Sequence, residues 1–344
     1  MINSIDDIYN ISKENNDLTR ATIELLTKCN WRCRHCYIPE HNNSGLEIEI
    51  IFELFYKLRD MGCFELVFTG GEPFFRKDIL DILRKARDMH FSVIIFTNIS
   101  LLNEEIIKQL SSLNISLISC SIFSLDNNIH DYITGVNGSL LSTLMNANLL
   151  KKYNIPLQIK TSLMKDNYKS YRDLKCYCDK NGFFYKADPV IFNKINGNSE
   201  PLNFRMSTEQ LSSVLKDVDT LSGVETRKHN NQNLICSDTK HSIYIDSKGD
   251  IYPCNRLLIK TGSVYNNDLS DIWNNSPILK IFQEMTWSSS PDCVDCEYES
   301  SCVRCPGNAL FENGSIFSKS NISCDIAKER FNYHKEIYSN EEIY

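Results

Sequence analysis

The sequence predicts an α/β protein in which a parallel sheet is followed by a second, cysteine-rich domain. Strand-like runs alternate with amphipathic helical runs over the first part of the chain, and this alternation is typical of parallel sheets. The 344 residues are 42% hydrophobic, which is enough to bury a sizeable core, and a chain of this length more often forms two domains than one. Seven of the 14 cysteines lie after residue 230, where we expect the second domain.

Six strand-like runs are predicted, each followed by polar or turn-forming residues. They cover residues 21–27, 65–68, 92–96, 116–122, 157–163 and 183–187. Between them, apolar residues recur at helical spacing, first at 51, 54, 55 and 58 and then over residues 78–89, 104–113, 140–153 and 168–179. The pattern therefore predicts six strand-helix units.

Three cysteines with CxxxCxxC spacing follow the first predicted strand, and they are Cys29, Cys33 and Cys36. Three thiolates on one short loop can hold three corners of an iron-sulfur cube, which usually takes four cysteines. One iron is then left for a ligand that is not protein, which is a catalytic arrangement. The alternatives are three buried cysteines or half of a zinc site.

With Tyr37 directly after Cys36, this motif resembles the signature of the radical S-adenosylmethionine (SAM) enzymes. In that family SAM chelates the open iron, and its reductive cleavage gives a 5′-deoxyadenosyl radical that abstracts hydrogen. The resemblance implies that the six units form a partial (β/α)6 barrel of the TIM type. In parallel barrels the site collects at the carboxyl ends of the strands.

Further motifs lie at those strand ends. Gly70, Gly71, Glu72 and Pro73 follow the second strand; the glycines allow a close approach to a ligand, and Glu72 offers an acceptor. In the family, the matching motif holds the methionine amino group of SAM. The resemblance also implies that Tyr37 lies against adenine and that Asn98 and Ser121 bind the ribose or the carboxylate. Many relatives have Gly after the third-strand Thr-Asn pair, whereas this chain has Ile99.

The expected domains are a short N-terminal extension over residues 1–20, a core over 21–225, a second domain over 230–335 and a tail over 336–344. Ser207 and Gln210 form a predicted capping box for a helix that runs to about residue 221. Beyond the polar linker, residues 242–245 and 250–254 read as a hairpin. The turn-rich stretch 130–139 resembles one found in radical SAM enzymes that modify ribosomally made peptides.

The cysteines of the second domain resemble those of the SPASM domain, which carries two auxiliary 4Fe-4S clusters. Paired CxxC units alone would also fit a structural zinc ribbon. The resemblance implies that Cys293, Cys296, Cys302 and Cys324 close one cluster and that Cys236, Cys254 and Cys305 hold the other, with one iron lacking a cysteine. This chain departs from the usual pattern in having two residues, rather than three, between Cys302 and Cys305. We expect Cys63, Cys120, Cys176 and Cys178 to be buried hydrophobic residues.

The net charge of −7 and the absence of a basic stripe argue against nucleic acid as the substrate. The sequence has no apolar signal region and no run long enough to span a membrane, and we expect a cytoplasmic enzyme with neither nucleic-acid nor membrane partners. In a reducing cytosol, metal ligation is a better account of the cysteines than disulfides.

The resemblance points to a radical SAM oxidoreductase that matures a ribosomal (RiPP) precursor peptide. The leading interpretation is that it installs a Cys thioether of the sactipeptide or ranthipeptide type, using SAM and three 4Fe-4S clusters, one SAM-binding and two auxiliary. Alternatives are a carbon-carbon crosslink, epimerisation or formylglycine formation, and, from another class, a non-catalytic Fe-S electron carrier or zinc-stabilised scaffold. Expected partners are the precursor peptide and a flavodoxin- or ferredoxin-type electron donor, and a separate leader-recognition protein is a further candidate. No catalytic acid or base is assigned.

Overall fold

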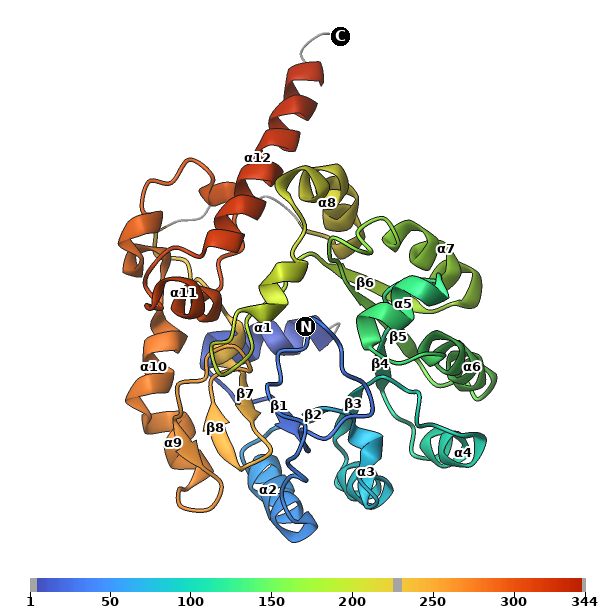
Figure 1. Cartoon of the computed structure of the whole chain (residues 1–344). Coiled ribbons are helices and arrows are strands. Elements are labelled where there is room, and N and C mark those ends of the chain that lie inside the picture. The colour runs from blue at the N-terminus through green and yellow to red at the C-terminus, as the bar shows by residue number, and fades with distance from the viewer. Residues whose placement is uncertain (1–4, 225–230, 342–344) are drawn as a thin grey trace.

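Six parallel strands in sequence order form the centre of the protein (Figure 1). A computed structural model describes residues 5–224 and 231–341. The strands are β1 (Arg20–Glu24), β2 (Glu65–Thr69), β3 (Ser92–Thr97), β4 (Leu117–Ser121), β5 (Leu157–Ser162) and β6 (Phe184–Asp188). Each overlaps one of the predicted strands, and the predicted partial barrel is confirmed.

Helices cover the outer face of the strands in Figure 1. They are α2 (Ile48–Asp60), α3 (Ile79–Asp88), α4 (Glu104–Ser112), α5 (Asn127–Thr134), α6 (Ser139–Lys152), α7 (Tyr171–Asn181) and α8 (Thr208–Ser222). The capping box of Ser207 and Gln210 is present. Phe55 and Phe68 are fully buried between α2 and β2, and they place the core between helices and sheet. None of the helices in the described ranges is long and apolar enough to cross a membrane.

Helix α5 was not predicted, because its residues were assigned to a turn-rich stretch. The side chain of Asp126 caps its first turn by accepting the backbone N–H of Asn128 at 2.8 Å. Gly135 ends it with φ +71°, a left-handed conformation that glycine adopts without a steric penalty.

The four cysteines that were expected to be buried differ from one another. Cys63, Cys120 and Cys178 are buried as expected, whereas Cys176 on α7 is exposed.

The sheet continues past the core into the C-terminal part of the chain. Strand β7 (Ser242–Ile245) pairs in parallel with β1, and β8 (Asp250–Tyr252) and β9 (Gly262–Ser263) follow in antiparallel order. The predicted hairpin is therefore present, but it extends the core sheet rather than forming a sheet of its own. The predicted boundary, residues 225–230, lies outside the described residues.

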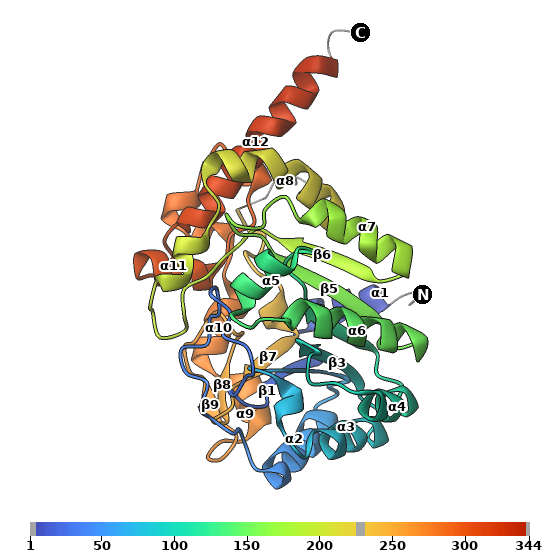
Figure 2. The same cartoon turned by 45° about the vertical axis from the view of Figure 1, so that its right-hand side comes forward.

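Helices and short loops complete the C-terminal region. The helices are α9 (Leu269–Asn275), α10 (Pro277–Glu284), α11 (Pro306–Asn313) and α12 (Asn321–Glu341). The predicted tail after residue 335 continues α12 as far as Glu341. Figures 1 and 2 both show α12 beside α8. There Arg330 forms an ion pair with Asp219 at 2.6 Å, and the Tyr333 hydroxyl donates to the same carboxylate at 2.7 Å.

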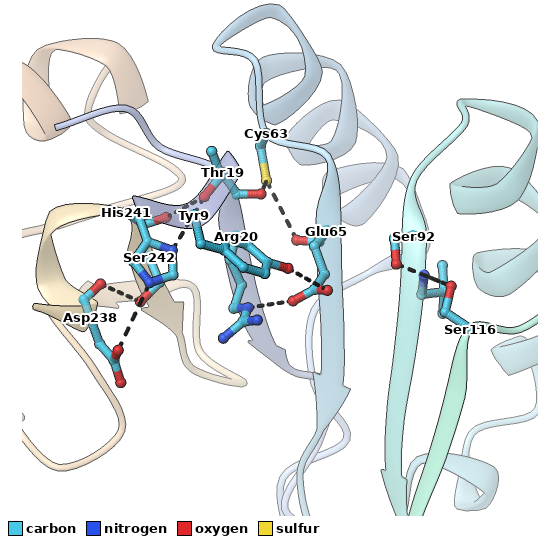
Figure 3. A network of polar contacts seen from close by, with 11 residues as sticks. Tyr9, Thr19, Arg20, Cys63, Glu65, Ser92, Ser116, Asp238, His241 and Ser242 are labelled. Carbon is cyan, nitrogen blue, oxygen red and sulfur yellow. Dashed lines mark hydrogen bonds and ion pairs between the residues drawn. The ribbon is translucent and has the colours of Figure 1, made fainter. Parts of the chain in front are cut away.

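The N-terminal extension contains a helix, α1 (Ile5–Asn15), that packs at the amino ends of the strands, opposite the loops that carry the predicted site. Tyr9 stacks on Phe64 with ring centroids 5.7 Å apart, and its hydroxyl donates to Glu65 at 2.8 Å. Arg20 on β1 forms an ion pair with the same carboxylate (Figure 3). His241, just before β7, also contacts Tyr9. The network joins α1, β1, β2 and the C-terminal region.

We expect Tyr9→Phe to lower the free energy of unfolding by about 1 kcal/mol, the contribution of one hydrogen bond. Arg20→Met should cost more, about 2–3 kcal/mol, because it leaves the Glu65 carboxylate, only 5% exposed, without its counter-ion; Arg20 itself is 32% exposed, which reduces the effect below that of a fully buried pair. Urea unfolding under anaerobic conditions, followed by circular dichroism, measures both. Tyr265→Phe, at a 56% exposed position, is the matched control. Equal midpoints for all three variants would contradict a stabilising role for this network.

Candidate active site

The carboxyl ends of β1 to β5 surround a cavity of about 210 Å³. Most residues that the sequence singled out for SAM and its cluster line this cavity, and they are Cys29, Cys33, Cys36, Tyr37, Gly70, Gly71, Asn98 and Ser121. Glu72 and Pro73 do not line it and are buried. The fold therefore brings together loops from four strands at the edge where parallel barrels carry their sites.

The three thiols of the loop after β1 lie close enough to influence one another's ionisation. Burial raises the pKa of Cys33 well above its ordinary range, and Cys36 and Cys29 raise it further. Burial likewise raises the pKa of Cys29 to about 11. The backbone N–H of Trp31 donates to the Cys29 sulfur at 3.4 Å. Such thiols keep their protons until a metal supplies positive charge, and metal binding then releases the protons.

The end of α5 supports this cysteine loop. The backbone N–H of Arg32 donates to the carbonyl of Thr134 at 2.9 Å, and that of Arg34 donates to Ile133 at 3.0 Å. A Cβ on Gly135 would lie only 3.0 Å from the carbonyl oxygen of Arg32. The stretch 130–139 thus has a direct structural role beside the cysteines.

Gly70 and Gly71 bring the loop after β2 against the loop after β1. The N–H of Gly71 donates to the Leu26 carbonyl at 2.9 Å. A Cβ on Gly70 would lie 2.3 Å from that carbonyl oxygen, and one on Gly71 would lie 2.3 Å from the carbonyl oxygen of Lys28. The glycines therefore permit a close approach between two backbone segments, in addition to lining the cavity.

Glu72 joins two loops of the site. Its carboxylate accepts hydrogen bonds from the Thr97 hydroxyl and the Asn98 backbone N–H, both at 2.7 Å, and from the N–H of Phe74 at 3.0 Å. The side chain is fully buried, does not line the cavity and connects the loops after β2 and β3, while its role toward the SAM amino group stays a prediction. Burial raises the pKa of Glu72 to about 7.

Ile99 adopts φ +55°, which is rare for a β-branched residue and marks local strain. Two hydrogen bonds hold the backbone in this conformation. The Asn146 amide donates to the Ile99 carbonyl at 2.8 Å, and the Thr97 hydroxyl accepts from the Ile99 N–H at 2.9 Å. The Asn98 amide is thereby directed to Asn30, at 2.9 Å.

The arrangement of Cys29, Cys33 and Cys36 fits an iron-sulfur cube better than a single metal ion. In the described parts of the chain, no three His, Cys, Asp or Glu side chains converge closely enough to hold one metal ion. Thiolates that bind separate irons of a cube need not share one atom and lie further apart. Three half-buried, free thiols around one cavity satisfy that requirement.

The seven C-terminal cysteines separate into two groups by their mutual influence. Burial raises the pKa of Cys254 to about 12, with Cys305 and Cys236 adding to the shift. Burial also raises the pKa of Cys302 to about 12, and here Cys324, Cys293 and Cys296 add to it. The groups have the same members as the two predicted ligand sets. Cys305 occupies the N-cap position of α11.

Sequence reasoning missed several side chains that line the cavity. Phe96, Ser119 and Lys160 alternate with core residues on β3, β4 and β5, and they face the lumen of the barrel. For Ser119 and Lys160 the signal was the period-two alternation of polar and apolar residues inside β4 and β5, whereas Phe96 stands in an apolar run that gives no such signal. The alternation indicates which face a residue is on, but it does not indicate that the lumen contains a site.

Comparisons with known proteins agree with this geometry. Residues 23–174 match the Radical SAM superfamily, and residues 236–306 match SPASM, an iron-sulfur cluster-binding domain. The chain is 22% identical to the AdoMet-dependent heme synthase of Methanosarcina barkeri, over 86% of this chain and 93% of that protein. It is 25% identical to the antilisterial bacteriocin subtilosin biosynthesis protein AlbA of Bacillus subtilis, over 90% of this chain and 71% of AlbA. The structure of Streptococcus suis SuiB bound to precursor peptide SuiA has a TM-score of 0.69 at 16% identity, covering 94% of this chain and 82% of SuiB.

Glu72→Gln should weaken SAM binding about tenfold, because an amide N–H₂ would face a donor and loosen the Thr97-Asn98 loop. The parent should also lose affinity as the pH falls from about 8 to about 6. The pKa of Glu72 is raised to about 7, so acid protonates the carboxylate and removes an acceptor. Equilibrium dialysis of SAM against the anaerobic protein at several pH values measures both effects, with Thr97→Val as a variant that removes one donor only. Identical affinity and pH dependence in parent and Gln variant would show that Glu72 does not position this loop.

Proposed function

Because the chain belongs to the radical SAM superfamily and carries a SPASM domain, we propose that it is a peptide maturase that forms a thioether between a substrate cysteine and a carbon of another residue. The names of two similar proteins support a peptide substrate, since AlbA is named for subtilosin biosynthesis and SuiB was solved with precursor peptide SuiA. The expected partners are a ribosomal precursor peptide, a flavodoxin- or ferredoxin-type electron donor and, as a further candidate, a leader-recognition protein.

The observation that carries the proposal is the position of the three-cysteine group. Cys305 lines a second cavity, of about 340 Å³, between the end of β6 and the C-terminal region. None of the four cysteines in the other group lines this cavity or the one at the ends of β1 to β5. A cube held by Cys236, Cys254 and Cys305 would have one ligand place unfilled by cysteine, and a substrate thiolate is the chemically matched ligand.

The chain's own residues would hold the reactants in place. Cys29, Cys33 and Cys36 would hold the cube that binds SAM, with Tyr37, Gly70, Gly71, Asn98 and Ser121 around the cofactor. When bound, these cofactors supply the 5′-deoxyadenosyl radical. Thioether formation joins the substrate carbon to the substrate sulfur and removes one hydrogen from each. One hydrogen atom would pass to the deoxyadenosyl radical, and the other would leave as a proton while its electron is accepted by the cluster that Cys236, Cys254 and Cys305 would hold.

Related chemistry on a peptide is the alternative. Gly249 and Cys254 form a GxxxxC motif. Sulfatase maturases that resemble this chain carry Asp directly after the cysteine of this motif, whereas this chain has Asn255. An amide cannot act as the base that a carboxylate provides. This residue disfavours formylglycine formation and leaves crosslinking and epimerisation as the competing peptide modifications.

We expect the anaerobic protein to carry about twelve irons per chain, as three 4Fe-4S clusters. Replacing Cys29, Cys33 and Cys36 together with Ala should lower this to about eight and abolish reductive cleavage of SAM, while auxiliary-cluster absorption remains, because no auxiliary cysteine lines the first cavity. Iron and sulfide analysis, together with chromatography of 5′-deoxyadenosine, provides the measurement. Bound zinc in place of iron, or an unchanged deoxyadenosine yield in the variant, would contradict the assignment.

A Cys-containing substrate peptide, identified from short reading frames beside this one, should lose two hydrogens on reaction and perturb the auxiliary-cluster EPR spectrum. Changing its acceptor Cys to Ser should abolish both effects, since a hydroxyl is a poor ligand for iron in a sulfur-bound cluster. Mass spectrometry and EPR of the matched peptides test this. If the Ser peptide is still modified, the thioether proposal is wrong and a crosslinking or epimerising maturase becomes the better interpretation.

A further inference from the structure

Two lysines on neighbouring strands face the lumen of the barrel. Lys160 on β5 and Lys186 on β6 are partners in the parallel register, and in-register neighbours project from the same face of a sheet. Leu157 and Ile159 of β5 pack in the hydrophobic core, so Lys160, which follows Ile159 directly, projects from the other face of the strand. Lys160 lines the first cavity together with the three cysteines of the β1 loop.

Neither lysine forms an ion pair in the part of the chain that the structure describes, although the Asp188 carboxylate at the end of β6 lies near enough to act on the charge of Lys160. The Lys160 ammonium lies 3.6 Å from the centre of the Phe96 ring, and no ion pair or hydrogen bond accompanies that contact. The pKa of Lys160 is lowered to about 8, mainly by burial and also by the charge of Lys186, while Asp188 opposes the decrease. A partly buried cation that forms no ion pair carries a desolvation cost that an anionic ligand would offset.

Positive charge continues from these lysines toward the auxiliary cysteines. Lys186 and Arg256 both line the second cavity, which also contains Cys305. Arg256 lies over the Phe192 ring, 3.0 Å from its centre, and burial lowers its pKa to about 10. Asp188, at the end of β6, offsets one of these three charges. The wall between the two cavities is therefore cationic, although the whole chain has a net charge of −7.

We propose that Lys160 and Lys186 bind carboxylate side chains of an acidic segment of the peptide substrate, next to the residue that is modified. This inference rests on the proposed peptide-maturase function and specifies its substrate class. An acidic peptide is repelled by the overall charge of the protein, so local cations must select it and fix its register. Lys160 lines the cavity of the cysteine loop and Lys186 lines the cavity that contains Cys305, so a peptide bound to both lysines would extend from one cavity to the other.

Carboxylates have two other sources at this site. SAM has a methionine carboxylate, and haem, which the heme synthase relatives are named for, has propionate groups. The experiment therefore measures the three ligands separately on the same protein. Its variants are Lys160→Met with Lys186→Met, and Lys108→Met on the exposed face of α4 as the matched control.

The probes are two rhodamine-labelled nonapeptides, each with a central cysteine flanked by two aspartates or by two asparagines. Fluorescence anisotropy on the reconstituted, SAM-loaded protein should show about tenfold tighter binding of the aspartate peptide, and the preference should weaken with added salt. The double variant should bind both peptides equally, while Lys108→Met should keep the preference. No preference in the parent, or a preference that persists in the double variant, overturns the inference.

Two further measurements distinguish the other carboxylates. If the double variant binds SAM more weakly by equilibrium dialysis but retains the aspartate preference, the lysines hold the methionine carboxylate and the inference fails. If lysine-dependent binding is seen for hemin and no peptide is modified by mass spectrometry, the proposed function itself fails. Modification of both peptides with equal efficiency and equal affinity would overturn only the acidic-substrate inference.

Discussion

Parallel pairing on both edges of β1 is the constraint on which the rest of the structure depends. β2 lies on one side and β7 on the other, so the cysteine loop that follows β1 is placed between the core and the C-terminal region. At the end of β1, the buried Glu24 carboxylate accepts the Tyr244 hydroxyl and the Ser247 hydroxyl, both at 2.7 Å. The same strand is fixed at its amino end by Arg20 and Glu65. Both ends of β1 are thereby held in register.

From this anchor, the site is built by loops that support one another. Gly70 and Gly71 let the loop after β2 rest on the cysteine loop, and Glu72 then holds the loop after β3. The strained Ile99 and its partner Asn146 complete the support. A buried acceptor with three donors is worth more in such a dry site than at the surface, because the groups cannot exchange with water. Side chains that never touch the cavity can therefore determine its shape.

The two cavities have chemically different walls. The first combines three thiols, backbone segments with glycine and a lysine, which suits a metal cluster and a charged cofactor. The second contains Cys305, Arg256 and Lys186 at the junction of the core and the C-terminal region. The ion pair between Arg330 of α12 and Asp219 of α8 also connects the C-terminal region to the core, in addition to the pairing of β7 with β1. A substrate that reaches both cavities would connect the two groups of cysteines.

The sequence by itself determined the six strands, the cysteine loop and the strand-end motifs, because alternation and motif spacing are local properties of the chain. It did not determine that Glu72 bonds Thr97 and Asn98, that β7 joins the core sheet, or that α1 packs on Glu65. Those features depend on which segments become neighbours in space. The direction of Lys160 could be read from strand alternation, but its contact with the Phe96 ring and its proximity to Lys186 and Asp188 depend on the pairing of strands that are distant in sequence.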